Sequence, residues 1–187
     1  MPLENRNDAV YVGTIYLGSP KSQPAKVVFD TGSEYLAVTS SLCDDKTSGN
    51  YKFKVFDTAH NDFIQKDVKD RCASSVYDMH QSDSSKILSK TSSKLSYGSA
   101  NLQGFIWEDN TCLQPGSANM TLAQQKENVC APFQFLALYK EEGLEADTDG
   151  ILGLSPHKNQ EKRDLHYLWN MKDKGIIDRA MVSFSIS

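Results

Sequence analysis

One carboxylate stands where a short apolar run ends, in the segment Phe29-Asp30-Thr31-Gly32-Ser33. Burying an ionisable group without hydrogen-bond partners costs several kcal/mol, so a chain seldom places one there without support. The turn offers that support, because two hydroxyl groups surround the acid and the glycine lets backbone N–H groups come close. The same residues also form ordinary turns, so chemistry at Asp30 is inferred only together with the rest of the chain.

Short strands must hold this turn in place. Residues 10–17 alternate in polarity, a turn follows at residues 18–21, and residues 25–29 return as the second strand of a hairpin that leads into Asp30. Further strands are expected at residues 35–38, 51–56, 94–98, 104–107 and 133–139. This pattern predicts an all-β fold.

The C-terminal part of the chain carries the one helix that we expect, from Leu165 to Lys172 and ended by Gly175. Residues 182–186 then alternate Val, Phe and Ile with serine, which predicts a strand. Because natural domains seldom stop in mid-strand, we expect the polypeptide to continue beyond Ser187.

Length and charge restrict the function classes. A chain of 187 residues can form one domain with a sizeable core. The net charge of −4, with no cluster of Lys and Arg, argues against binding to nucleic acid or to an anionic membrane surface. No apolar run approaches the roughly 18 residues of a membrane span, so no membrane insertion is expected. Residues 1–8 are too polar for a signal peptide.

The four cysteines are widely spaced, and the simplest of their three possible pairings is sequential, Cys43–Cys72 and Cys112–Cys130. Four buried thiols are the alternative.

Asn119-Met120-Thr121 is a candidate glycosylation sequence, consistent with a secretory route. Between the first two cysteines and on to Lys94 the chain is polar, and we interpret about residues 44–94 as a loop-rich surface excursion.

We expect no metal ion and no cofactor. The histidines do not cluster and no Cys-x-x-Cys pair exists, which disfavours zinc. Residues 145–150 resemble the start of a calcium-binding loop, but Pro156 stands where the bidentate Glu should be. No nucleophilic Ser or Cys motif accompanies His157 or His166, so both are expected on the surface.

Three further segments carry a resemblance to a family. Residues 11–20, Tyr-Val-Gly-Thr-Ile-Tyr-Leu-Gly-Ser-Pro, precede Asp30 as a similar hairpin precedes the catalytic aspartate of pepsin-like aspartic proteases. Residues 97–104 resemble the flap of these enzymes, and residues 149–154, Asp-Gly-Ile-Leu-Gly-Leu, match the segment beside their catalytic loop. The resemblance implies an all-β, pepsin-like acid protease lobe, a double-psi type barrel with a flap hairpin and one short helix. Residues 1–187 would form a single N-terminal lobe.

The resemblance also implies a role for each matched residue. Asp30 would be the catalytic carboxylate. The residues that would orient it by hydrogen bonds are Thr31, Gly32 and Ser33. The flap residues that would close over substrate are Tyr97, Gly98 and Ser99. The structural residues beneath the loop would be Ile151, Leu152 and Gly153.

The chain contains only one Asp-Thr-Gly and no Asp-Ser-Gly. Members of the family hydrolyse peptide bonds with two carboxylates that share one proton, so the chain alone is expected to be inactive as a monomer. Its partners would be a peptide or protein substrate and either a missing C-terminal lobe or a second copy of the chain, as in retroviral-type proteases. A non-catalytic lobe that binds peptides or proteins is a further alternative. The implied location is the secretory pathway, outside the cell or in a lysosome or vacuole.

One departure from the family concerns the flap. Ala37 stands where the family has a tryptophan whose indole N–H anchors the flap tyrosine. The position of Tyr97 must therefore depend on other contacts, and Trp107 is a candidate substitute.

Overall fold

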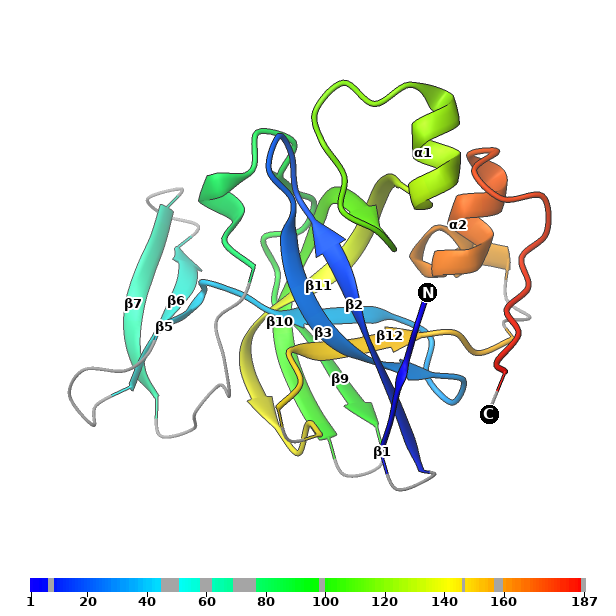
Figure 1. The fold of residues 1–187 in the computed structure, drawn as a ribbon. Coiled ribbons are helices and arrows are strands. Elements are labelled where there is room, and N and C mark those ends of the chain that lie inside the picture. The colour runs from blue at the N-terminus through cyan, green and yellow to red at the C-terminus, as the bar shows by residue number, and fades with distance from the viewer. Residues whose placement is uncertain are drawn as a thin grey trace.

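The computed structural model describes residues 1–6, 9–44, 51–57, 62–68, 77–97, 100–145, 147–156 and 160–185, and most of its elements are strands (Figure 1). In chain order the elements are β1 (Glu4–Arg6), β2 (Val10–Leu17), β3 (Gln23–Asp30), β4 (Leu36–Thr39), β5 (Cys43–Asp44), β6 (Tyr51–Asp57), β7 (Asp62–Val68), the 3-10 helix η1 (Met79–Gln81), β8 (Lys86–Ile87), β9 (Ser93–Tyr97), β10 (Ala100–Cys112), α1 (Leu122–Asn128), β11 (Ala131–Glu142), β12 (Gly150–Gly153), the 3-10 helix η2 (Gln160–Leu165) and α2 (Tyr167–Asp173). The all-β class is confirmed. No helix among these elements is long and apolar enough to cross a membrane.

Six strands close into a ring. β2 pairs with β3, β3 with β12, β12 with β4, β4 with β11, β11 with β10, and β10 again with β2. The pairings of β12 with β3 and of β4 with β11 are parallel, whereas the other four are antiparallel. β5, β6 and β7 form a separate three-stranded sheet beside this barrel (Figure 1).

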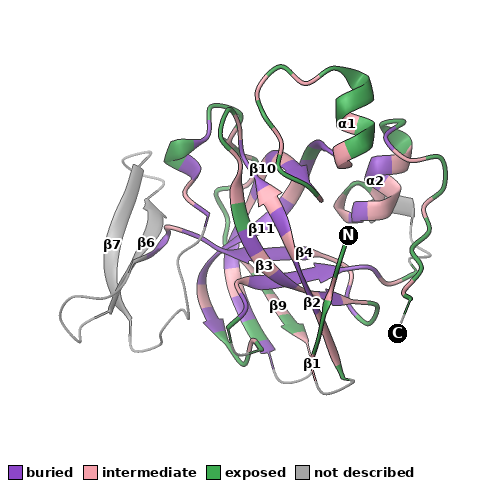
Figure 2. Ribbon diagram, viewed as in Figure 1, coloured by how far each residue is buried: buried purple, intermediate pink, exposed green. Residues whose placement is uncertain are grey.

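Alternation along the strands fills the barrel with apolar side chains. In β3, every second residue from Ala25 to Phe29 is buried, and the residues between them are partly exposed. Buried positions follow the barrel strands in Figure 2. The large side chains that are completely covered include Ile15, Leu17, Leu36, Phe105, Phe133 and Phe135. The hairpin that leads to Asp30 is thereby anchored along its whole length.

Part of the polar segment at about residues 44–94, which was expected on the surface, lies in the apolar core. The side chains of Tyr77 and Met79 are 0% and 3% exposed, and both lie in the main apolar cluster. The Tyr77 hydroxyl donates a 2.7 Å hydrogen bond to the buried carboxylate of Asp109. The expectation of a surface loop is therefore wrong at this point, because the chain returns to the barrel here. The expected strand at residues 51–56 is present as β6, and its partner β7 was not expected.

A second helix, α1, corrects the expectation of only one. Its N-terminus is a capping box, since Thr121 and Gln124 each bond the other's backbone N–H group. The spacing Thr-x-x-Gln is visible in the sequence and predicts such a start. The expected helix α2 is present, and Gly175, with φ +68°, follows its C-terminus.

The strand expected at the C-terminus is not formed by residues 182–185, which belong to no strand. A strand requires a neighbour to complete its backbone hydrogen bonds, and none of the described strands pairs with this segment. Its apolar side chains still pack, with the Phe184 and Tyr11 ring centroids 6.1 Å apart.

Cys112 and Cys130 form a disulfide across 18 residues. Cys43 is also disulfide-bonded, and its expected partner Cys72 lies outside the described residues. Replacing Cys112 and Cys130 together by serine should lower the free energy of unfolding by about 3 kcal/mol, because the unfolded chain gains the entropy of an open loop. Urea denaturation measures the loss, with Ser117→Ala in the same loop as the control. Equal midpoints for the two variants would contradict this expectation.

Candidate active site

Asp30 is the last residue of β3 and lies opposite Gly153 of β12 in the parallel register. The backbone after β12 continues along the Asp30 turn through further hydrogen bonds. The N–H groups of Gly153, Leu154 and Ser155 donate to the carbonyl oxygens of Tyr35, Asp30 and Ser33, at 3.0, 2.7 and 2.9 Å. The loop that presents the carboxylate is therefore fixed by backbone contacts, independently of its own side chains.

Gly153 makes this close approach possible. A Cβ atom at this position would lie 2.5 Å from both the carbonyl carbon of Glu34 and the backbone nitrogen of Tyr35. Real Cβ atoms do not approach backbone atoms so closely. Ile151 and Leu152, which precede it, are buried in two different apolar clusters on the two faces of β12. All three residues thus pack against the strands that carry the loop.

The Asp30 carboxylate accepts a 2.8 Å hydrogen bond at Oδ1 from the backbone N–H of Gly32. Asp30 itself is half-buried, and Thr31 and Gly32 are exposed. The side chain of Ser33 points inward and is 2% exposed, but its hydroxyl has no hydrogen-bond partner among the described residues. Of the three orienting residues expected from the sequence, this structure shows only Gly32 bonded to the carboxylate.

Tyr97 approaches the same loop from the β9–β10 hairpin, in which it pairs with Ala100. Burial raises the pKa of Tyr97 well above its ordinary value, and the nearby charges of Tyr35, Glu34 and Asp30 raise it further. Gly98 and Ser99, the other expected flap residues, lie outside the described part of the chain.

The candidate substitute for the missing tryptophan lies on the wrong face of its strand. Trp107 packs in the main cluster inside the barrel, whereas Tyr97 packs in the second cluster, together with Ala37. Successive residues of a strand point to opposite faces, so the indole of Trp107 cannot reach Tyr97 in this arrangement. Tyr97 instead packs against the apolar cluster that contains Ala37.

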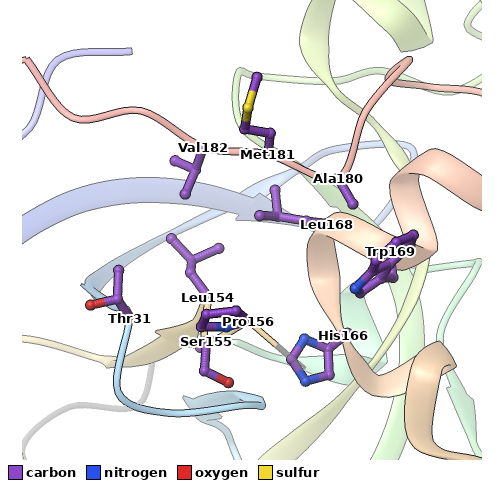
Figure 3. Close-up of a pocket in the computed structure, with 11 residues that line it drawn as sticks. Thr31, Leu154, Ser155, Pro156, His166, Leu168, Trp169, Ala180, Met181 and Val182 are labelled. Carbon is purple, nitrogen blue, oxygen red and sulfur yellow. The ribbon is translucent and has the colours of Figure 1, made fainter. Parts of the chain in front are cut away.

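A pocket of about 240 Å³ lies beside the Asp30 loop, with Thr31 in its lining (Figure 3). Thr31, Ser155 and His166 line it on one side, and residues 180–182 form the opposite wall. His166 is only 2% exposed, so the expectation of a surface histidine is wrong. It is buried because it immediately precedes α2, which packs against the barrel. The sequence signal for Ser155 and His166 is their position: Ser155 directly follows residues 149–154, and His166 is the second residue of the helix expected from Leu165 to Lys172.

Comparison with known proteins supports one family. A family model described as eukaryotic aspartyl protease matches residues 10–187. Pregnancy-associated glycoprotein 2 of Sus scrofa is 29% identical over 187 residues, which are 100% of this chain and 36% of that protein. Pepsin A of Bos taurus is 30% identical over 186 residues, 100% of this chain and 41% of that protein. Cathepsin D of Dictyostelium discoideum is 27% identical over 190 residues, 100% of this chain and 40% of that protein.

The chain spans less than half the length of each of these relatives. The match nevertheless extends over nearly all of its own residues, from the β2–β3 hairpin through Asp30 to α2 and the C-terminal segment. The chain therefore belongs to the eukaryotic aspartyl protease family.

Proposed function

We propose that this chain is the N-terminal lobe of a two-lobed aspartic endopeptidase and that Asp30 is one of its two catalytic carboxylates. The observation that carries the proposal is the half-buried Asp30, held by the Gly32 N–H and by the backbone after β12. The lengths of the relatives support the second lobe, since this chain accounts for 36–47% of them.

The reaction requires two acids in different protonation states. An ionised carboxylate takes a proton from water while the water oxygen attacks the peptide carbonyl carbon. A protonated carboxyl donates its proton to the carbonyl oxygen, and the tetrahedral intermediate then collapses with loss of the amine. Two carboxyls a few ångströms apart can share one proton, because they cannot both ionise easily. Asp30 supplies one of these groups, and the second comes from the other lobe.

Tyr97 closes over the bound peptide and excludes water from the reacting atoms. In this role it is a positioning residue. The substrate is a peptide or an unfolded segment of a protein, since a flap must enclose an extended chain. The disulfides and the kinship with pepsin and cathepsin D support a location in the secretory pathway or in a lysosomal compartment.

The proposal is tested by comparing the 187-residue chain with the complete polypeptide that contains it. Cleavage of an unfolded protein substrate is measured at acidic pH, and the oligomeric state of each sample is determined by sedimentation. We expect the complete polypeptide to cleave and the monomeric 187-residue chain to show no cleavage above background. Activity that accompanies a dimer of the short chain would instead assign the second carboxylate to a second copy. Activity of the monomer would overturn the proposal.

A further inference from the structure

The disulfide-closed segment between β10 and β11 is not used by the proposed reaction. It runs from Cys112 to Cys130, contains α1, and stands at the edge of the barrel beside α2 (Figure 1). Within it lies Asn119-Met120-Thr121, the only Asn-x-Ser/Thr sequence in the 187 residues. We propose that Asn119 carries an N-linked oligosaccharide, attached before this segment folds.

The site can hold a bulky group. Asn119 is exposed, and no hydrogen bond joins its side chain to another described residue. Its φ of +60° is a left-handed conformation that asparagine adopts more readily than most residues. The neighbours Ser117 and Thr121 are exposed as well. An oligosaccharide on this side chain would extend into solvent without displacing a packed group, as N-glycosylation requires.

Thr121, the threonine of the Asn-x-Thr sequence, is also the N-cap residue of helix α1 in the folded chain. Its hydroxyl accepts a 3.3 Å hydrogen bond from the N–H of Gln124 and lies 3.1 Å from Oε1 of Gln124, to which it donates. The Thr121 N–H also donates to Oε1 of Gln124, at 2.9 Å. The requirement for Ser or Thr two residues after Asn means that this hydroxyl takes part in acceptor recognition. Once α1 has formed, the hydroxyl is occupied by the capping box, so transfer must come first.

The disulfide provides an independent reason for the same compartment. Cys112–Cys130 forms in an oxidising environment, which for a eukaryotic chain is the secretory route where such glycans are added. Closing the 18-residue loop brings Asn119 into the compact segment. Glycan transfer and disulfide closure therefore compete in time for the same stretch of chain.

The transfer step is a substitution at an anomeric carbon. The donor is an oligosaccharide linked through a diphosphate to a lipid. The amide nitrogen of Asn119 forms a bond to the anomeric carbon, and the bond from that carbon to the diphosphate oxygen breaks. The diphosphate leaves with the electron pair, and one amide proton passes to a base. No oxidant or reductant is needed.

The experiment expresses the full 187-residue chain with a secretion signal in eukaryotic cells and analyses the retained and secreted pools together. Digestion with an amidase that removes N-linked glycans should reduce the mass by one oligosaccharide and convert Asn119 to aspartate. Asn119→Gln and Thr121→Ala should lose the shift completely. Thr121→Ser, which keeps the hydroxyl, should retain it.

Two variants test the order of events. Gln124→Ala removes the amide oxygen that accepts from the Thr121 hydroxyl and N–H but leaves the sequon intact. Cys130→Ala prevents loop closure without creating a second Asn-x-Ser/Thr sequence at Asn128. Both should carry the glycan on at least as large a fraction of molecules as the natural chain. A natural chain without a glycan, or a mass shift that persists in Asn119→Gln, would overturn the proposed site. A lower fraction in both Gln124→Ala and Cys130→Ala would overturn the proposed order.

Discussion

If this chain is the catalytic lobe proposed above, Asp30→Asn in the complete polypeptide that contains it should reduce kcat for peptide cleavage by about 10³-fold or more, with little change in KM. The substitution keeps the size of the side chain and an oxygen that can still accept the 2.8 Å hydrogen bond from the Gly32 N–H. It removes the group that exchanges a proton with the attacking water or with the second carboxyl. Because the loop is held by backbone hydrogen bonds to Leu154 and Ser155, its geometry should survive the change.

The matched control is Asp178→Asn, the same chemical change at an exposed aspartate after α2. This variant should retain the natural rate. Thermal denaturation should give closely similar midpoints for both variants, which separates a lost proton transfer from a lost fold. An Asp30→Asn enzyme that keeps more than about a tenth of the natural kcat would exclude Asp30 as a catalytic carboxylate.

Substitutions at Tyr97, the proposed flap residue, should have a smaller effect on kcat/KM that the same assay can detect. Tyr97→Phe removes the phenolic oxygen but keeps the ring that packs near Ala37. If apolar packing holds the flap, this variant should keep kcat/KM within about tenfold, whereas Tyr97→Ala should lose more. Equal losses in the two variants would show that the hydroxyl, rather than the ring, holds the flap.

Local patterns predicted the strands that approach the site. The alternation in residues 10–17 and 25–29 indicates a hairpin, and the structure contains β2 and β3 at these positions. Each such strand buries every second side chain, and this period is visible in the sequence without knowledge of its neighbours. The parallel pairing of β12 with β3 joins residues more than 100 positions apart. No local pattern contains that pairing, and only the resemblance of residues 149–154 indicated it.

The predictions for residues 182–185 and for His166 were wrong because both depend on tertiary contacts that a local pattern does not contain. Residues 182–185 alternate as a strand should, but alternation does not supply a hydrogen-bonding neighbour, and the described strands offer none. His166 is polar, yet it is buried by its place before α2. The failure to predict helix α1 has a different origin. The Thr121–Gln124 capping box is a local pattern that the sequence itself displays, and it indicates the start of a helix.

Gly153→Ala should lower the free energy of unfolding by about 3 kcal/mol or more, because the added methyl group overlaps backbone atoms that cannot rotate away. The Cβ atom would lie 2.5 Å from the carbonyl carbon of Glu34 and from the nitrogen of Tyr35. Relief requires β12 to separate from the loop, which breaks the hydrogen bonds at Gly153, Leu154 and Ser155. The loss of stability is thus coupled to the position of the Asp30 carboxylate.

The matched comparison is Gly175→Ala, which introduces the same methyl group after α2. A Cβ atom there meets no other atom within 4 Å, but φ is +68°, so this variant pays only the cost of a left-handed alanine, about 1 kcal/mol. Urea denaturation of the two variants measures the difference directly. A Gly153→Ala chain as stable as Gly175→Ala would mean that β12 can move away from the Asp30 loop at little cost. In that case the backbone after β12 would not fix the carboxylate, and the geometry proposed for the active site would lose its main support.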